Sequence, residues 1–184
     1  MTYTPTPPAG DTSSAVLAIR NLSVEVAGAG NRVVRNLSLD VHAGETVCVV
    51  GESGSGKSVT SLAVMGLLPP GVLAVSAGSI RVEGEDVVGA TQRRLREMRA
   101  TRMAMVFQEP MTALNPVHTV GKQVDEVLRL HRKNMSAAER RAKVLEMFQS
   151  VHLPDVERIY DSYPHQLSGG QRQRIVIAMA LILE

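Results

Sequence analysis

Residues 51–58 form the strongest pattern in this sequence, the glycine-rich segment GESGSGKS. It fits G-x-x-x-x-G-K-[ST], in which backbone N–H groups surround a phosphate and a lysine reaches it. The short Val-rich run 45–50 precedes it and is typical of a strand buried on both faces of a parallel sheet. Residues 57–68 have a helical pattern that ends before two prolines. A strand, a turn and a helix in this order predict an α/β fold that binds a phosphorylated ligand.

Each residue type in this segment has a chemical reason to be there. Gly51, Gly54 and Gly56 let the backbone coil closely around an anion. The helix that begins at Lys57 directs the positive end of its dipole to the same place, and Lys57 can reach the β- and γ-phosphates of a nucleotide. The Ser58 hydroxyl can ligate Mg²⁺. The predicted phosphate-binding residues are Gly51, Glu52, Ser53, Gly54, Ser55, Gly56, Lys57, Ser58 and Val59.

An ordinary glycine turn and a dinucleotide-binding turn are the alternatives for this segment. A chance match to the whole pattern in a chain of this length has odds under about 1%. The flanking strand and helix patterns also favour a phosphate site over an ordinary turn. The dinucleotide pattern G-x-G-x-x-G does not match the spacing of Gly51, Gly54 and Gly56, and it gives Lys57 and Ser58 no role.

The composition limits the class of protein. A chain of 184 residues with 44% hydrophobic residues has the length and the apolar content of one domain with a core. Its 20 Lys and Arg against 18 Asp and Glu give a formal net charge of +2, too small by itself to indicate a nucleic-acid partner. No apolar run approaches the ~18 residues of a membrane-spanning helix. The single cysteine, Cys48, excludes a disulfide framework and is expected to pack in the buried strand.

The remaining elements are predicted from periodicity. Residues 17–26 and 32–41 alternate apolar and polar side chains on either side of a Gly-rich turn, which predicts a hairpin. Ser136 and Glu139 have the spacing of a capping box at the start of a helix. The other expected segments are a disordered tail at 1–14, a strand and turn at 79–87, a basic helix at 91–101, a short apolar strand at 103–107, helices at 119–131 and 136–152, and a helix that begins at Ser168.

Two further motifs make the pattern specific to a family. Gln108-Glu109-Pro110 follows the strand expected at 103–107, and the sequence LSGGQ at 167–171 opens the last helix. With the glycine-rich loop, this order resembles the ATP-binding subunits of ABC transporters over about residues 15–184. Segments 108–116 and 163–174 are similar to the dipeptide/oligopeptide/nickel importer ATPases and, within that group, to the ATP-binding components of glutathione importers.

The resemblance implies a P-loop NTPase fold of the ABC type, with a mixed sheet, an antiparallel hairpin and a helical subdomain. Residues 15–107 would hold the core strands and the phosphate-binding loop. Residues 108–166 would form the Q-loop and the helical subdomain, and 167–184 the signature motif and its helix. The resemblance also implies that the C-terminal part of this core is missing from the chain.

The resemblance assigns roles to the matching residues. Lys57 and Gln108 would be the catalytic residues. Gln108 would contact Mg²⁺ and the attacking water. Ser58 and Gln108 would be the metal ligands. Residues of the signature motif would contact ATP bound to a second, facing ATPase domain, or act as an ordinary helix cap, or do both. These signature residues are Ser168, Gly169, Gly170 and Gln171.

The implied cofactors are ATP and Mg²⁺. The implied partners are a second ABC ATPase domain, membrane permease subunits and, indirectly, a solute-binding protein, at the cytoplasmic face of the cell membrane. A non-transport ABC ATPase and a nucleotide-binding module without catalysis are the alternatives. The arginines of the basic helix have no aromatic residues between them, so a solvated face is expected rather than a nucleic-acid site. They are Arg93, Arg94, Arg96, Arg99 and Arg102.

Two features depart from the family pattern. The first hairpin, around residues 26–32, has no aromatic residue to stack on adenine. The expectation is therefore either weaker or less selective binding of the base, or an aliphatic contact from Val24 or Val26. The sequence after Gln171 also contains no apolar strand ending in Asp-Glu, the pair that supports Mg²⁺ and polarises water in the family. The chain is therefore expected to be truncated before the Walker B strand, to bind nucleotide weakly and to hydrolyse it negligibly.

Overall fold

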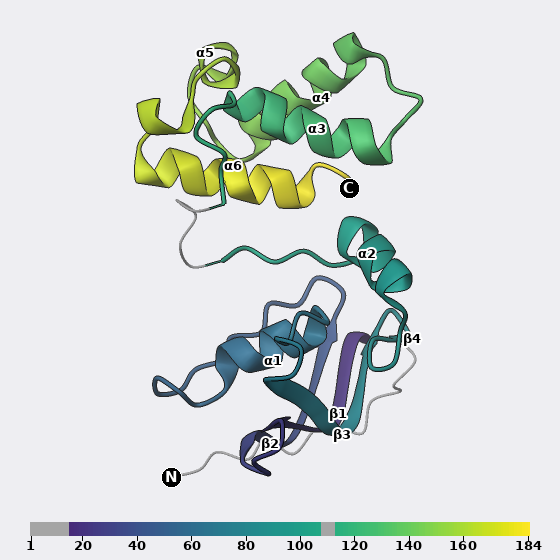
Figure 1. Cartoon of the computed structure of the whole chain (residues 1–184). Coiled ribbons are helices and arrows are strands. Elements are labelled where there is room, and N and C mark those ends of the chain that lie inside the picture. The colour runs from purple at the N-terminus through teal and green to yellow at the C-terminus, as the bar shows by residue number, and fades with distance from the viewer. Residues whose placement is uncertain (1–14, 108–112) are drawn as a thin grey trace. The chain divides into compact units, whose positions relative to one another are not determined.

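A computed structural model describes residues 15–107 and 113–184 of the chain. The chain divides into two compact units, Met1–Met103 and Ala104–Glu184 (Figure 1). The tail predicted at 1–14 lies outside the described residues.

The first unit is built on a four-stranded antiparallel sheet. Its strands are β1 (Ala15–Val26), β2 (Arg32–His42), β3 (Leu73–Val82) and β4 (Glu85–Asp86), in the order β2-β1-β3-β4. The hairpin predicted at 17–26 and 32–41 is confirmed as β1 and β2, with Ile19 opposite Leu39. On the other side of β1, Ile19 pairs with Ile80 of β3, and both isoleucines are fully buried. The apolar alternation that predicted the hairpin therefore marks the core face of the sheet.

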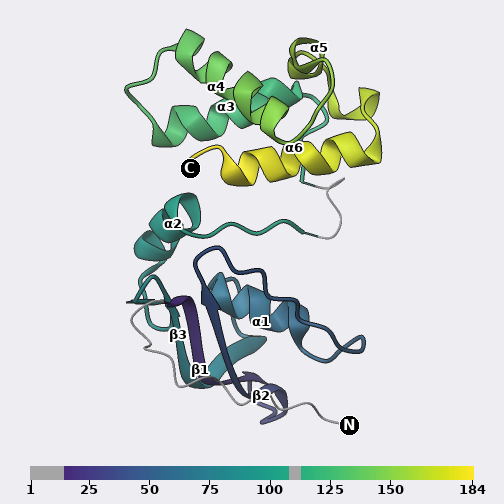
Figure 2. The same cartoon turned by 180° about the vertical axis from the view of Figure 1, so that it is seen from behind.

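Two helices complete the first unit: α1 (Lys57–Val64) and α2 (Gln92–Thr101). The helix α1 lies against β2 and begins at Lys57, as the sequence predicted, although it is shorter than the segment 57–68 (Figure 2). Ala63 of α1 shares one buried apolar cluster with Leu95 and Met98 of α2 and with the inner face of the sheet. This cluster fixes both helices relative to the strands.

Two strand predictions are wrong. The segments 45–50 and 103–107 are not strands, and several of their apolar side chains are exposed: Val49 by 56%, Val50 by 83% and Phe107 by 52%. Cys48 is exposed too, and does not pack in a core. A strand needs a neighbour that accepts and donates its backbone hydrogen bonds, and within residues 15–107 and 113–184 no strand pairs with either segment. The parallel part of the expected mixed sheet is therefore not seen in the described residues.

The second unit is helical. It contains α3 (Val120–His131), α4 (Ala137–Ser150), α5 (Val156–Tyr160), a 3₁₀ turn η2 (Pro164–Gln166) and α6 (Gly169–Leu181). The helices predicted at 119–131, 136–152 and from Ser168 are confirmed, and the capping box of Ser136 and Glu139 is present. The short helix α5 and the turn η2 were not predicted, because one turn leaves too few residues for a period to show. The core of this helical unit includes Phe148 of α4, Ile159 of α5 and Ile175 of α6, all fully buried.

Tyr160 packs where three helices meet. A Cβ on Gly121 of α3 would lie 2.3 Å from the ring of Tyr160, so only glycine leaves room for this ring. The guanidinium of Arg141, from α4, also lies over this ring, 4.1 Å from its centroid. Burial is the main cause that raises the pKa of the Tyr160 hydroxyl. The close approach of α5 to α3 therefore depends on a residue with no side chain.

No helix in the part of the chain that the structure describes combines the length and the apolar character needed to cross a bilayer.

Candidate functional site

The glycine-rich loop connects residues 45–50 to the N-terminus of α1. The Ser55 N–H donates to the Glu52 carbonyl at 3.2 Å, which closes a turn. Gly54 and Gly56 have φ of +81° and +92°, in the left-handed region that side chains disfavour. A Cβ on Gly56 would also lie 3.0 Å from the Val33 carbonyl oxygen of β2. Gly56 is therefore needed both for its backbone conformation and for the close contact between the loop and β2.

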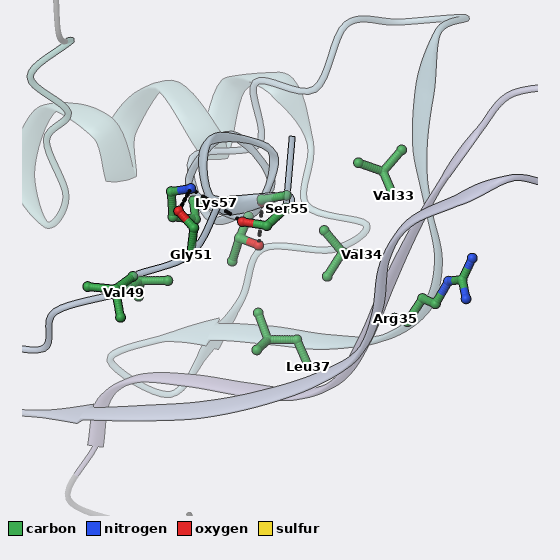
Figure 3. Close-up of a pocket in the computed structure, with 11 residues that line it drawn as sticks. Val33, Val34, Arg35, Leu37, Val49, Gly51, Ser55 and Lys57 are labelled. Atoms are coloured by element: carbon green, nitrogen blue, oxygen red, sulfur yellow. Dashed lines mark hydrogen bonds between the residues drawn. The ribbon is translucent and has the colours of Figure 1, made fainter. Parts of the chain in front are cut away.

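Lys57 is bonded to its own loop. Its Nζ donates to the Gly51 carbonyl oxygen at 2.7 Å and to Ser55 Oγ at 3.3 Å (Figure 3). It also donates to the Glu52 carbonyl oxygen at 2.7 Å. These three oxygens hold the ammonium beside the loop, at the start of α1. A bound phosphate would offer the same ammonium anionic oxygens in place of neutral carbonyls, and such charge-assisted bonds are stronger.

The N-terminus of α1, like that of α3, has no side-chain cap. Gly56 provides no side-chain cap, and the first turn contains no acidic residue. In contrast, the side chains of Thr91, Ser136 and Ser168 accept hydrogen bonds at the N-termini of α2, α4 and α6. The first N–H groups of a helix have no partner inside the helix and carry its positive partial charge. At α1 these groups adjoin Lys57, which makes the loop suited to an anion.

A cavity of about 410 Å³ lies between this loop and β2. That volume is within the range of small-molecule sites. Its walls are apolar on the side of β2 and polar at the loop, and the side chain of Arg35 extends away from the loop (Figure 3). The lining residues are Val33, Val34, Arg35, Leu37, Val49, Val50, Gly51, Ser55, Gly56, Lys57 and Thr60.

The structure separates the two candidates for an aliphatic contact with a base. Val24 is fully buried in the sheet core and has no surface to offer a ligand. Val26 is half-buried at the end of β1. Val26 remains the candidate of the two.

The donor set available for a metal ion is small. Ser58 is exposed at the start of α1, and Gln108, the other expected ligand, lies outside the described residues. Within 15–107 and 113–184, no group of three His, Cys, Asp or Glu side chains could hold a metal. Mg²⁺ in phosphate-transfer sites takes one or two protein oxygens and completes its shell with phosphate oxygens and water. The single hydroxyl of Ser58 fits a magnesium ion that arrives with a nucleotide.

In the signature motif, Ser168 and Gln171 cap α6. The Gln171 N–H donates to Ser168 Oγ at 3.2 Å, and the Ser168 N–H donates to Gln171 Oε1 at 2.9 Å. Gly169 and Gly170 are exposed, and a Cβ on either would meet nothing within 4 Å. Neither glycine has a positive φ. Nothing in the fold of this unit therefore requires these two residues to be glycine.

The basic helix α2 departs from the expectation of a solvated face. Arg93 and Arg96 are exposed, as predicted. Arg94 instead forms a two-point ion pair with Glu85, at 2.5 and 2.6 Å, and this pair is the first cause that holds the pKa of Glu85 below its usual range. Arg102 also bonds to Glu85, at 2.9 Å, and Arg99 donates to backbone carbonyls at the end of α1. Sequence reasoning missed these roles because the acceptors lie at least nine residues away in the chain.

The ABC transporter family profile matches residues 34–184. The glutathione import ATP-binding protein GsiA of Pectobacterium atrosepticum is 49% identical over 173 residues, which is 90% of this chain and 28% of that protein. The dipeptide transport ATP-binding protein DppD of Bacillus subtilis is 48% identical over 92% of this chain and 51% of its own length.

Among solved structures, the dimeric post-hydrolysis state of the ATP-binding cassette MJ0796, bound to ADP and Pi, superposes with a TM-score of 0.77. It is 29% identical and covers 91% of this chain, which in turn covers 69% of that cassette. The chain thus spans about a quarter to a half of the length of the two curated relatives, and about two thirds of the cassette.

Proposed function

The chain belongs to the ABC transporter family, and we propose that it supplies the nucleotide-binding part of an ATPase that drives import of peptides or a related small solute. The solute class comes from the relatives, which are named for glutathione and dipeptide transport. In this proposal the ATPase acts at the cytoplasmic face of the membrane, on permease subunits that a solute-binding protein serves.

One observation carries the proposal: Lys57 stands at the uncapped N-terminus of α1, inside a loop whose glycines have positive φ. In the proposed mechanism, the loop N–H groups of 51–59 and the Lys57 ammonium bind the β- and γ-phosphates of ATP. Mg²⁺ held by Ser58 would neutralise charge on these phosphates. Gln108 is the proposed residue that orients the attacking water.

The signature motif is proposed to act on a second ATPase domain. Ser168, Gly169 and Gly170 are exposed at the N-terminus of α6, and the two glycines leave that surface free of side chains. A flat helix N-terminus can approach the γ-phosphate of a nucleotide held by a facing domain. The dimeric state of the cassette MJ0796 supports such a pairing.

The chain itself is expected to bind ATP and to turn it over negligibly. Residues 172–184 contain one carboxylate, Glu184, which follows the end of α6 rather than a strand. Phosphoryl transfer needs a group that positions the attacking water as well as groups that bind the phosphates. Lys57 and the loop supply the second requirement, but Gln108, a neutral amide, can only orient the water and cannot accept its proton.

The test is to measure binding of a fluorescent ATP analogue with Mg²⁺ to the 184-residue chain, together with release of inorganic phosphate. We expect saturable binding that Lys57→Ala abolishes and Lys133→Ala, at an exposed lysine of the second unit, leaves unchanged. Absence of binding by the unmodified chain would refute the nucleotide site. Phosphate release of about 1 per second that depends on Lys57 would refute the expectation of negligible turnover.

A further inference from the structure

The C-terminus of α1 ends in a Schellman motif. Gly66 has a φ of +61°, its N–H donates to the Ala63 carbonyl at 3.0 Å, and the Leu67 N–H donates to the Leu62 carbonyl at 2.8 Å. These two bonds satisfy carbonyls of the last turn that have no partner inside the helix. The carbonyls of Met65 and Gly66 lie beyond them and need other donors.

Arg99 of α2 supplies those donors. Its Nε donates to the Met65 carbonyl and its Nη2 to the Gly66 carbonyl, each at 2.8 Å. The last turn of α1 contains no basic residue of its own. Arg99 therefore brings the positive charge that the C-terminal end of a helix favours, from a residue 33 positions away.

Packing reinforces this contact. A Cβ on Gly66 would lie 3.0 Å from Leu95 Cδ1 and 3.3 Å from Arg99 Nη2, so α2 rests directly on the turn that ends α1. Leu95 and Met98 share the buried cluster with Ala63 of α1. The guanidinium is thus held between a packed helix and the two carbonyls.

We propose that Arg99 is a positioning residue for the phosphate-binding loop, which it reaches through α1. An eight-residue helix is a stiff rod about 12 Å long, so the contacts that fix its C-terminus also set where its N-terminus presents N–H groups and Lys57. This inference rests on the proposed function, in which that N-terminus binds nucleotide. Arg99 itself lies at the opposite end of the helix and does not contact the loop.

The same helix offers a matched control. Arg102 also has ionic contacts, which are more exposed, and its partners are Glu83 and Glu85, next to the end of the sheet, at 3.4 and 2.9 Å. Loss of Arg102 should disturb the attachment of α2 to the sheet and leave the end of α1 intact. Arg99→Lys adds a second comparison, because an ammonium cannot donate to two carbonyls in the fixed fork of a guanidinium.

The experiment compares Arg99→Ala, Arg99→Lys and Arg102→Ala in the full chain. The readouts are the affinity for a fluorescent ATP analogue with Mg²⁺, amide hydrogen exchange in the nucleotide-free protein, and the thermal unfolding midpoint. We expect Arg99→Ala to weaken affinity roughly three- to tenfold and to speed exchange at 54–60. Arg99→Lys should restore part of the affinity and part of the slow exchange. Arg102→Ala should change the affinity and the exchange rate by no more than about twofold, even where it lowers the unfolding midpoint as much as Arg99→Ala does.

Equal losses of affinity for Arg99→Ala and Arg102→Ala, or unchanged exchange at 54–60 in both Arg99 variants, would overturn the proposal. If Arg99→Ala does not fold, the milder Arg99→Lys decides the question by the same exchange measurement. If the unmodified chain binds no nucleotide, the proposed function fails, while the exchange comparison still tests whether Arg99 positions the loop.

Discussion

The Nζ atom of Lys57 lies 2.7 Å from the carbonyl oxygen of Gly51, the first glycine of the loop that Lys57 ends. The loop is therefore closed by its own charged residue, with a second bond of equal length to Glu52. A phosphate that binds here must compete for an ammonium that already has acceptors. The measured affinity for a phosphate ligand will therefore reflect the bonds gained to phosphate less the bonds that Lys57 loses to the loop carbonyls.

The first prediction concerns the nucleotide-free chain. Lys57→Met keeps the length of the side chain and removes its charge and donors, so the bonds to Gly51 and Glu52 are lost. We expect the free energy of unfolding to fall by about 0.5–1.5 kcal/mol, measured by urea denaturation without nucleotide. Lys133→Met is the control and should change it by less than about 0.5 kcal/mol. Equal stability of Lys57→Met and the unmodified chain would show that the loop does not depend on these bonds.

The second prediction ranks two glycines of the loop. Gly54→Ala places a Cβ in open space, so the cost is the positive φ alone, about 1–2 kcal/mol. Gly56→Ala adds a contact at 3.0 Å with the backbone oxygen of Val33, which cannot move aside as a side chain could. We expect Gly56→Ala to be the more destabilising by at least about 1 kcal/mol in denaturant unfolding. The reverse order would contradict the described contact between the loop and β2.

Local sequence patterns predicted the hairpin of β1 and β2, the start of α1 at Lys57 and the caps at Ser136 and Ser168, because each depends on residues close together in the chain. The segment 45–50 shows the limit of this reasoning. Its apolar run resembles a buried strand, but pairing requires a neighbouring strand, and no local pattern reveals whether one is available. Arg99 shows a second limit, since its acceptors on α1 are defined only by the packing of α2.

The third prediction uses the ion pair of Glu85 and Arg94. Since the hydrogen bonds from Arg94 lower the pKa of Glu85 in the folded chain, the unfolded chain binds its proton at higher pH. The stability from this pair is therefore fully present above the ordinary glutamate pKa of about 4.3 and is lost as pH falls below it. We expect Glu85→Gln to be less stable than the unmodified chain at pH 7, with a gap that narrows between about pH 5 and pH 3. The check is thermal unfolding of both proteins at each pH. If the stability difference between them stays constant over that range, the ion pair of Glu85 is not its source.

The fourth prediction concerns the packing of α5 on α3. Gly121→Ala would place a Cβ 2.3 Å from the ring of Tyr160, so the ring or the helix must shift. We expect a loss of about 2 kcal/mol or more, together with a change in tyrosine fluorescence or near-UV circular dichroism. Gly169→Ala makes the same chemical change at an exposed site with open space and serves as the control. If both variants unfold at the same denaturant concentration, the described contact with Tyr160 is wrong.

The fifth prediction separates folding from function in the signature motif. Gly170→Ala adds one methyl group where nothing lies within 4 Å, and alanine favours a helix over glycine by up to about 1 kcal/mol. We therefore expect stability that is unchanged or slightly higher. If Gly170 approaches a nucleotide on a second domain, the same methyl group should weaken dimerisation driven by a non-hydrolysable ATP analogue, measured by sedimentation.

Ser136→Ala, which removes a cap far from the motif, should instead lower stability by about 1 kcal/mol and leave dimerisation intact. A stable Gly170→Ala chain that dimerises as readily as the unmodified chain would exclude this glycine from the interface, and an unmodified chain that stays monomeric would count against the pairing itself.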